Sequence, residues 1–252
     1  MTSPALVLGG RAIRETWRTP EAIVPTLFIP LFFLVVNVGQ AGRIFPAGHT
    51  SFLHGQGYAA FQLPASLLLA ASFGSAAMFL VEDIEGGYFD KLRATPIPRT
   101  AIAFGRLAAE GLKSLVLTAA LTVVAMAFGV RLASGPFGFV LLLLLTAGWA
   151  VVFSGFMQLI ALKTRSAAAT QSGGLVFFPL LFLTPNFVPR HMLTHPMEIA
   201  ATINPVTYIM EAMRSLILVH FDWAAIGKGF LVVGLAGLAM AALNARAIRA
   251  YD

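Results

Sequence analysis

The sequence predicts an all-α protein that crosses the membrane several times, and six spans fit it best. Hydrophobic residues make up 58% of the 252 residues and charged residues only 11%, whereas soluble domains carry about 25% charged residues. The mean hydropathy is +0.83. A span needs about 20 mostly apolar residues, and the windows of that kind are 21–40, 57–81, 104–130, 136–162, 167–188 and 223–245. We therefore expect one transmembrane domain over residues 1–252, with little polar sequence left for a soluble domain.

The residues before the first window predict a helix that lies in the membrane interface. Leu6, Ile13 and Trp17 share one helical face, and beside it runs a basic stripe of Arg11, Arg14 and Arg18. Tryptophan and cations are typical of interfacial helices. The alternative is a solvated basic leader. No apolar core of a signal peptide follows the first charges, so a cleaved signal peptide is not expected.

The distribution of cations predicts that both termini face the cytoplasm. The sequence has 17 Lys and Arg; with the N-terminus inside and six spans, five face outward and 17 − 5 = 12 remain inside, in agreement with the cationic bias of cytoplasmic loops. The outward cations are Arg43, Arg131, Arg190, Arg214 and Lys228. The net charge of +6 is thus explained by an inner or plasma membrane protein, and nucleic-acid binding is not expected.

The polar segment between the second and third windows has the pattern of a short amphipathic helix. Gly86-Gly87 permits a sharp turn, and Pro96 stops a helix that starts near Tyr88. Its apolar side would carry Tyr88, Phe89 and Leu92, while Asp90, Lys91 and Arg93 would face water. Such a helix would lie along the cytoplasmic face with its polar side open to a partner. The alternative is an ordinary charged loop.

The second long polar segment, residues 186–222, is predicted to lie outside. Pro189, Pro196 and Pro205 prevent one continuous helix. After Asn204-Pro205, however, residues 206–219 have helical apolar spacing. That helix is too short to span, so we expect it to re-enter the membrane or to lie at the outer interface.

The first polar segment resembles the cytoplasmic loop of ABC-2-type transporter permeases, in particular the branch related to daunorubicin- and doxorubicin-resistance exporters. That branch shows an acidic residue and then Gly-x-x-Asp-(Arg/Lys)-Leu-Arg-x-x-Pro-x-x-Arg. The matching residues here are Gly87, Asp90, Lys91, Leu92, Arg93, Pro96 and Arg99. The chain departs from the branch at Ile84, where many relatives have Arg, and at Tyr88, where many have Thr.

A second motif, before the last window, is similar to the family's Asn-Pro-x-Thr-Tyr…Glu-x-x-Arg. Its residues here are Asn204, Pro205, Tyr208, Glu211 and Arg214. The two motifs occur in the family's order, and the expected topology agrees with it over the whole chain. Glu211 and Arg214 are three residues apart on a predicted helix, so we expect them to pair.

The resemblance implies a permease subunit of an ATP-driven exporter for a drug, antibiotic or lipid. Such a protein would take part in efflux and antibiotic resistance. It would work as a dimer with an identical copy or a paralogue and with two ATP-binding cassette subunits, which would bind ATP and Mg²⁺. Residues 88–95 would form the coupling helix. The residues so implicated are Glu82, Asp83, Glu85, Gly87, Tyr88, Asp90, Lys91, Leu92, Arg93, Pro96 and Arg99. The sequence contains no Gly-x-x-x-x-Gly-Lys-(Ser/Thr) loop for phosphate, so no cofactor or catalytic residue is expected in this chain.

Ionisable residues at membrane depth are candidates for function. Arg106, Glu110 and Lys113 lie on one face at the start of the third window and can pair along it. They would form a self-neutralising stripe, or an anchor for the N-terminal helix or the ATPase. His191 and His195 lack an evident third ligand, so no metal site is expected.

Two other functions fit a polytopic protein. An intramembrane lipid-modifying enzyme would use the external histidines with Glu198 or Glu211, but no nucleophile or metal set can be assembled. An ion-coupled secondary transporter would be expected to show an inverted repeat with broken spans, and no convincing repeat is found in the sequence.

Overall fold

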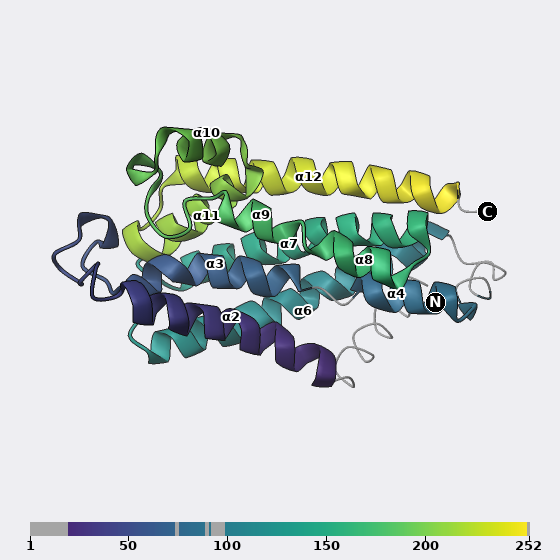
Figure 1. Cartoon of the computed structure of the whole chain (residues 1–252), viewed down its shortest axis with the longest axis horizontal. Helices are drawn as coiled ribbons and strands as arrows, with labels where there is room; N and C mark the ends of the chain where they lie inside the picture. Colours follow the sequence, from purple (N-terminus) through teal and green to yellow (C-terminus); the bar gives the residue numbers. More distant parts are fainter. Residues whose placement is uncertain (1–19, 74–75, 89–90, 92–98, 251–252) are drawn as a thin grey trace.

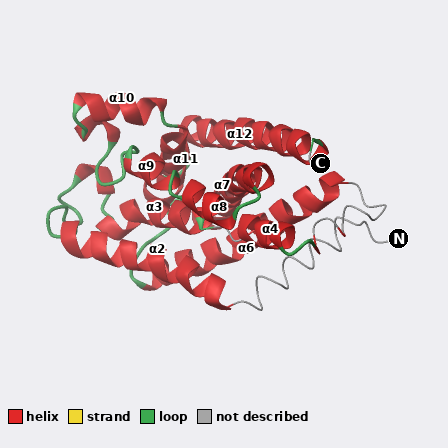
Figure 2. Ribbon diagram, turned by 45° about the vertical axis from the view of Figure 1, so that its right-hand side comes forward, coloured by secondary structure: helices red, strands yellow, loops and turns green. Residues whose placement is uncertain are grey.

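A computed structural model describes the chain except residues 1–19, 74–75, 89–90, 92–98 and 251–252. The described residues form a bundle of helices without β-strands (Figure 1, Figure 2). The expected all-α class is thus confirmed, together with several apolar helices. The predicted interfacial helix before residue 20 lies outside the described residues.

Long apolar helices run roughly along the bundle (Figure 1). In the described part of the chain, four helical segments are long and apolar enough to cross a membrane: Tyr58–Glu85, Phe104–Ala127, Gly135–Thr164 and Trp223–Arg249. They correspond to α3 (Tyr58–Ser72) with α4 (Ala76–Glu85), α6 (Arg99–Ala127), α7 (Gly135–Thr164) and α12 (Trp223–Arg249). The second, third, fourth and sixth predicted windows therefore fall on these helices, with ends that differ by a few residues.

The first and fifth windows fall on shorter apolar helical segments, Thr26–Ala41 and Ala167–Phe182. The first belongs to α2 (Pro20–Ala41). The fifth is divided into α8 (Ala167–Gly174) and α9 (Phe177–Phe182). The exact count of six spans stays a prediction.

The fifth window was predicted to run to residue 188, but α9 ends at Phe182. Proline explains the early end. Pro185 disfavours the helical conformation of the residue before it, whereas Pro179 falls in the first turn of α9, where its missing N–H is tolerated. The apolar residues Phe187 and Val188 therefore lie in a non-helical loop, which hydropathy alone does not distinguish from a span.

The bundle has two ends with different contents (Figure 1). We call one the α4 end: α4 and α12 finish there, and α7 passes into α8. We call the other the α11 end. It holds the loop 42–57 with the 3-10 turn η1 (Ser51–Leu53), the 3-10 turn η2 (Arg190–Met192), α10 (His195–Ile203) and α11 (Pro205–Arg214). The segments predicted to be cytoplasmic and external are thus separated between the α4 and α11 ends.

The helix α11 lies inside the bundle rather than on its surface. Val206, Ile209, Met210 and Met213 are fully buried, and α11 packs against α12 and α3. It continues into a π-helical turn, η3 (Ser215–Val219), and π-turns are frequent at functional sites. The predicted helical stretch 206–219 is therefore helical throughout, but its last turn is wider than an α-helix.

The helices differ in burial. In Tyr58–Glu85, 73% of the apolar window is buried, whereas in α12 only 11% of the apolar window is buried. On α12, Leu231, Leu235 and Leu238 are exposed and follow one another at helical spacing. The span formed by α3 and α4 is thus the core of this chain, and α12 presents an apolar face to lipid or to another chain.

Candidate functional site

The centre of the α11 end is a buried arginine held by backbone oxygens. Arg214 is 7% exposed. Its Nε donates to the carbonyl oxygen of Phe61 at 3.2 Å, its Nη1 to that of Pro185 at 2.6 Å and its Nη2 to that of Asn186 at 3.0 Å. The guanidinium carbon lies 3.6 Å from the centre of the Phe61 ring, close enough for a cation–π contact. One side chain therefore ties α11 to α3 and to the loop after α9.

The oxygens around Arg214 are themselves fixed by α3. The Tyr58 hydroxyl donates to the carbonyl oxygen of Phe187 at 2.7 Å. Gln62 Nε2 donates to the Tyr58 hydroxyl at 2.9 Å and to the carbonyl oxygen of Asn186 at 3.2 Å. The loop 185–187 is thus held from both sides, by α3 and by Arg214. We call Tyr58, Phe61, Gln62, Asn186 and Arg214 the arginine cage.

Arg214 keeps its positive charge although it is buried. Burial lowers the pKa of Arg214 to about 9, while the nearby Glu211 raises it. The guanidinium therefore stays protonated at neutral pH. Hydrogen bonds from a charged donor are about twice as strong as neutral ones, so the three carbonyl contacts are strong in this water-poor position.

The other residues of the second motif shape α11. Asn204 caps the helix: its Oδ1 accepts from the backbone N–H of Val206 at 3.0 Å, and its Nδ2 donates to the carbonyl oxygen of Leu180 at 2.6 Å. Pro205 occupies the first helical position, where its missing N–H costs nothing. The Tyr208 hydroxyl donates to the carbonyl oxygen of Thr202 at 2.7 Å. Asn204 and Tyr208 therefore fix how the chain passes from α10 into α11.

Glu211 does not make the expected hydrogen-bonded pair with Arg214. Its two carboxylate oxygens accept from Arg190, Oε1 from Nε at 3.0 Å and Oε2 from Nη2 at 2.8 Å. Arg190 also lies 5.2 Å from the centre of the Tyr208 ring. The prediction was wrong because Arg214 points toward α3, where three carbonyls take its N–H groups. Glu211 instead joins α11 to η2.

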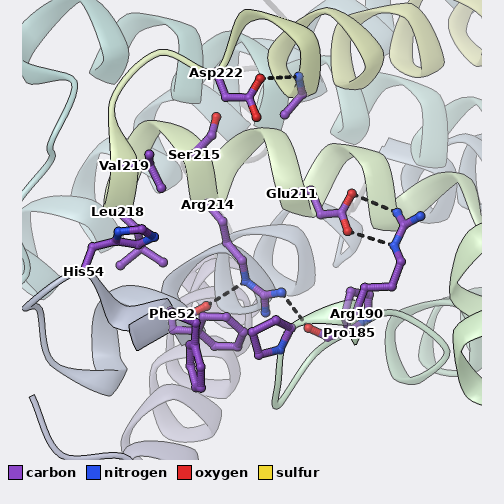
Figure 3. Close-up of a pocket in the computed structure, with 13 residues that line it drawn as sticks. Phe52, His54, Pro185, Arg190, Glu211, Arg214, Ser215, Leu218, Val219 and Asp222 are labelled. Carbon is purple, nitrogen blue, oxygen red and sulfur yellow. Dashed lines mark hydrogen bonds and ion pairs between the residues drawn. The ribbon is translucent and has the colours of Figure 1, made fainter. Parts of the chain in front are cut away.

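A pocket of about 290 Å³ opens beside these residues. Figure 3 shows Arg214 pointing toward Pro185 and Phe52, the carboxylate of Glu211 facing Arg190, and His54 and Asp222 elsewhere on the pocket wall. Asp222 is engaged as the N-cap of α12. The lining of the pocket thus combines apolar residues with two arginines and two carboxylates.

The α4 end buries charges in a different way. Asp83 of α4 forms an ion pair with Arg106 of α6, and Glu110 pairs with Lys113 within α6. Arg106, Glu110 and Lys113 are each less than 9% exposed. The partner of Arg106 in this ion pair, Asp83, lies 23 residues away in sequence, and the spacing along α6 does not predict it. Lys113 and Glu110 pair along one face, as their spacing allows.

The acidic end of α4 contacts a further helix. Glu85 Oε1 accepts from the backbone N–H of Ala167 at 3.0 Å, at the first residue of α8. A carboxylate there complements the positive end of the helix dipole. Glu82 is exposed. The end of α4 is therefore joined to α6 through Asp83 and to α8 through Glu85.

The rest of the first motif is described only in part. Gly87 has a φ of +70°, in the left-handed region that favours glycine. Tyr88 is partly exposed, and Tyr88 and Lys91 have helical conformation. Arg99 begins α6. The predicted coupling helix, with Asp90, Leu92, Arg93 and Pro96, otherwise lies outside the described residues.

Metal binding finds no support in the described part of the chain, where no group of three or more His, Asp or Glu is placed to hold an ion. His54, His191 and His195 are exposed at the α11 end. The polar contacts at both ends are hydrogen bonds and ion pairs between helices.

Sequence reasoning missed several residues in and around the arginine cage. Pro185 and Asn186 accept hydrogen bonds from Arg214 through their backbone oxygens. Every residue type has such an oxygen, so the sequence does not show which ones take part. Arg190 was noted as an external cation without a role, and only the fold brings it to Glu211. Gln62 lies within the second predicted window, and the structure shows that it bonds to the loop after α9.

The family described as ABC-2 type transporter matches residues 5–218 of this chain. A similar curated protein is the daunorubicin resistance ABC transporter permease protein DrrB1 of Streptomyces coeruleorubidus. It is 25% identical over 213 residues, which cover 82% of this chain and 72% of the relative. The matched region includes both motifs and the arginine cage.

Proposed function

We propose that this chain, which belongs to the ABC-2 type transporter family, is the permease subunit of an ATP-driven exporter for a hydrophobic or amphipathic compound. The observation that carries the proposal is the family match over residues 5–218, which contains both sequence motifs. The 25% identity to a daunorubicin resistance permease supports export of a drug or antibiotic, and a lipid has the same amphipathic character.

In this proposal ATP and Mg²⁺ are bound by two separate ATP-binding cassette subunits. The segment from Glu82 to Arg99 would be their docking site, and a second copy of this chain or a paralogue would complete the pore. The ion pair between Asp83 and Arg106 and the contact of Glu85 with Ala167 support this role. Through them, movement of the docked segment would reach α6 and α8 together.

The compound would pass along apolar surfaces that this chain leaves open. On α2, Phe28 and Phe32 are 62% and 53% exposed, and on α9 Phe182 is 43% exposed. Stacked aromatic faces suit planar apolar compounds, and Phe28 and Phe32 lie with their ring centres 6.0 Å apart. We therefore propose that the first and fifth spans contribute to the substrate path.

Transport into inside-out membrane vesicles tests this function. Vesicles with this chain and its partner ATPase should accumulate a fluorescent anthracycline when ATP is added. The matched control carries the same ATPase with its phosphate-binding lysine replaced. Uptake driven by an ion gradient without ATP would instead favour a secondary transporter. Retained function after replacement of all five histidines would rule out the enzyme alternative.

The orientation can be tested separately, because the chain contains no cysteine. Single cysteines at exposed Lys91 and exposed His54 can be labelled with a membrane-impermeant maleimide. We expect His54→Cys to react in intact cells and Lys91→Cys only after the cells are broken. The reverse result would place the α4 end outside and contradict the proposed coupling.

A further inference from the structure

A second cavity, unrelated to either motif, lies on the outside of the bundle at the α11 end. It is a groove of about 610 Å³ between the last turns of α6 and the first turns of α7. Its walls are apolar, from residues such as Val123, Met126, Val130 and Phe139, and the one charged residue in the lining is Arg131. Val123 and Met126 are 59% and 47% exposed, so the groove opens to the surroundings of the bundle. For a span in a membrane those surroundings are lipid.

Arg131 is held in place by its backbone. Its N–H donates to Gln56 Oε1 at 3.0 Å, and Gln56 Nε2 donates to the carbonyl oxygen of Ile217 at 2.8 Å. The residues after it are bonded to the same π-helical turn. Ala133 N–H donates to the Ile217 oxygen at 3.0 Å, and the Ser134 hydroxyl to the Leu216 oxygen at 2.7 Å. The link between α6 and α7 therefore presents Arg131 from a fixed position.

The charge of Arg131 has no counter-ion within the groove. No acidic residue lines it, and the sequence has none between Glu110 and Glu198. Arg131 is also exposed, so it avoids the cost of burial. A cation at the mouth of an apolar groove, at the end of a spanning helix, complements a molecule with an anionic head and an apolar tail.

We propose that this groove binds one anionic phospholipid. The phosphate would accept hydrogen bonds from the Arg131 guanidinium, whose planar fork suits phosphate oxygens. One acyl chain would lie along Val123, Met126 and Val130. The lipid belongs to the outer leaflet if the α11 end is external, which rests on the proposed orientation; the binding itself rests on neither orientation nor transport.

Bound lipid also bears on the arginine cage. The link that carries Arg131 is bonded to η3, and η3 directly follows Arg214. A ligand that binds only the folded link stabilises it. Anionic lipid should therefore raise the thermal stability of the α11 end, and it should do so through Arg131.

Native mass spectrometry of the full-length chain, purified in detergent with its ATPase where the two remain associated, tests the proposal. Phosphatidylglycerol is titrated into the wild type, Arg131→Gln, Arg131→Lys and the matched control Arg43→Gln, which removes another exposed cation at the same end. We expect about tenfold weaker binding of the tightest lipid in Arg131→Gln, partial retention in Arg131→Lys and no change in Arg43→Gln. Val123→Trp should also weaken binding by filling the groove, whereas Leu235→Trp, on the exposed face of α12, should not.

Two further probes separate the parts of the ligand. Diacylglycerol has the chains without phosphate, and glycerol phosphate has the phosphate without chains, so each should bind much more weakly than phosphatidylglycerol. Equal binding of phosphatidylglycerol to Arg131→Gln and Arg43→Gln would mean non-specific surrounding lipid and overturn the site. If glycerol phosphate bound as tightly as phosphatidylglycerol, the groove would be a site for free phosphate, and the lipid assignment would be overturned. Because no step requires transport, these outcomes are independent of whether the exporter function holds.

Discussion

The two ends of the bundle both bury charge, but they neutralise it with different partners. At the α4 end, Asp83 faces Arg106 and Glu110 faces Lys113, so side chains pair with side chains. At the α11 end, Arg214 is held by the backbone oxygens of Phe61, Pro185 and Asn186. Side-chain pairs can separate and form again when helices shift. A cage of backbone oxygens exists only while three chain segments keep their positions.

This difference suits opposite tasks. The α4 end receives the proposed docking segment and must pass on its movement, so pairs between α4, α6 and α8 are appropriate there. The α11 end must keep α11 and the loop after α9 together in the region that we propose to face the outside. The predictions below test whether the two kinds of pairing respond differently to mutation.

The largest effect is expected at Arg214. Replacing it with Met removes a charged donor from three carbonyl oxygens, of which that of Asn186 keeps its hydrogen bond from Gln62, and each buried group left unsatisfied costs about 1–3 kcal/mol. The free energy of unfolding should fall by about 3–5 kcal/mol, measured from the thermal unfolding midpoint in detergent. Arg214→Lys should recover little, because one ammonium cannot reach three oxygens around it. Arg43→Met is the matched control and should leave the midpoint unchanged; a similar loss in both would show that the cage adds nothing specific.

The next largest effect is expected at Asp83 and Arg106. Either Asp83→Asn or Arg106→Gln leaves a buried charge without this partner and should cost about 3 kcal/mol. The double variant removes both charges and should regain more than half of that loss, which thermal unfolding of all four proteins in a double-mutant cycle measures. Additive losses would mean that the two residues do not act as a pair. No second substitution should rescue Arg214→Met in this way, since its partners are backbone atoms.

A smaller effect is expected for the Arg190–Glu211 pair, which is 25% and 34% exposed. Solvent screening limits such pairs to about 0.2–1 kcal/mol. Arg190→Gln should lower the unfolding midpoint slightly, and the difference from wild type should shrink as salt is raised. A loss as large as that of Arg214→Met would show that Arg190 also belongs to the rigid cage.

The smallest effect on stability is expected at Glu85. Its hydrogen bond to the Ala167 N–H is solvent-exposed, so Glu85→Ala should cost no more than about 0.5–1 kcal/mol. If Glu85 passes movement to α8, however, transport per ATP hydrolysed should fall while the unfolding midpoint barely moves. The neighbouring exposed Glu82→Ala provides the control for stability. Unchanged coupling in Glu85→Ala would remove α8 from the proposed route.

The sequence was most informative where apolar length or local spacing decides the structure. Long apolar runs located α6, α7 and α12, Asn204-Pro205 located the start of α11, and a spacing of three placed Glu110 beside Lys113. It was least informative where the fold brings distant groups together. Nothing local links Asp83 to Arg106 or Arg190 to Glu211, and the partners of Arg214 are peptide oxygens. The end of α9 was misplaced because hydropathy does not register that Pro185 disfavours a helical conformation in the residue before it.

The central claim is that a separate ATPase drives this chain through the segment from Glu82 to Arg99. The most direct measurement is ATP-dependent transport by the reconstituted complex with Asp90, Lys91 and Arg93 all changed to Ala. We predict at least about tenfold slower transport, since charge-assisted contacts to the ATPase would be lost, with the unfolding midpoint of this chain unchanged. A control with Arg43 and Lys228 changed to Ala should transport normally. If the triple variant assembles with the ATPase and transports as fast as the wild type, the account of coupling is wrong.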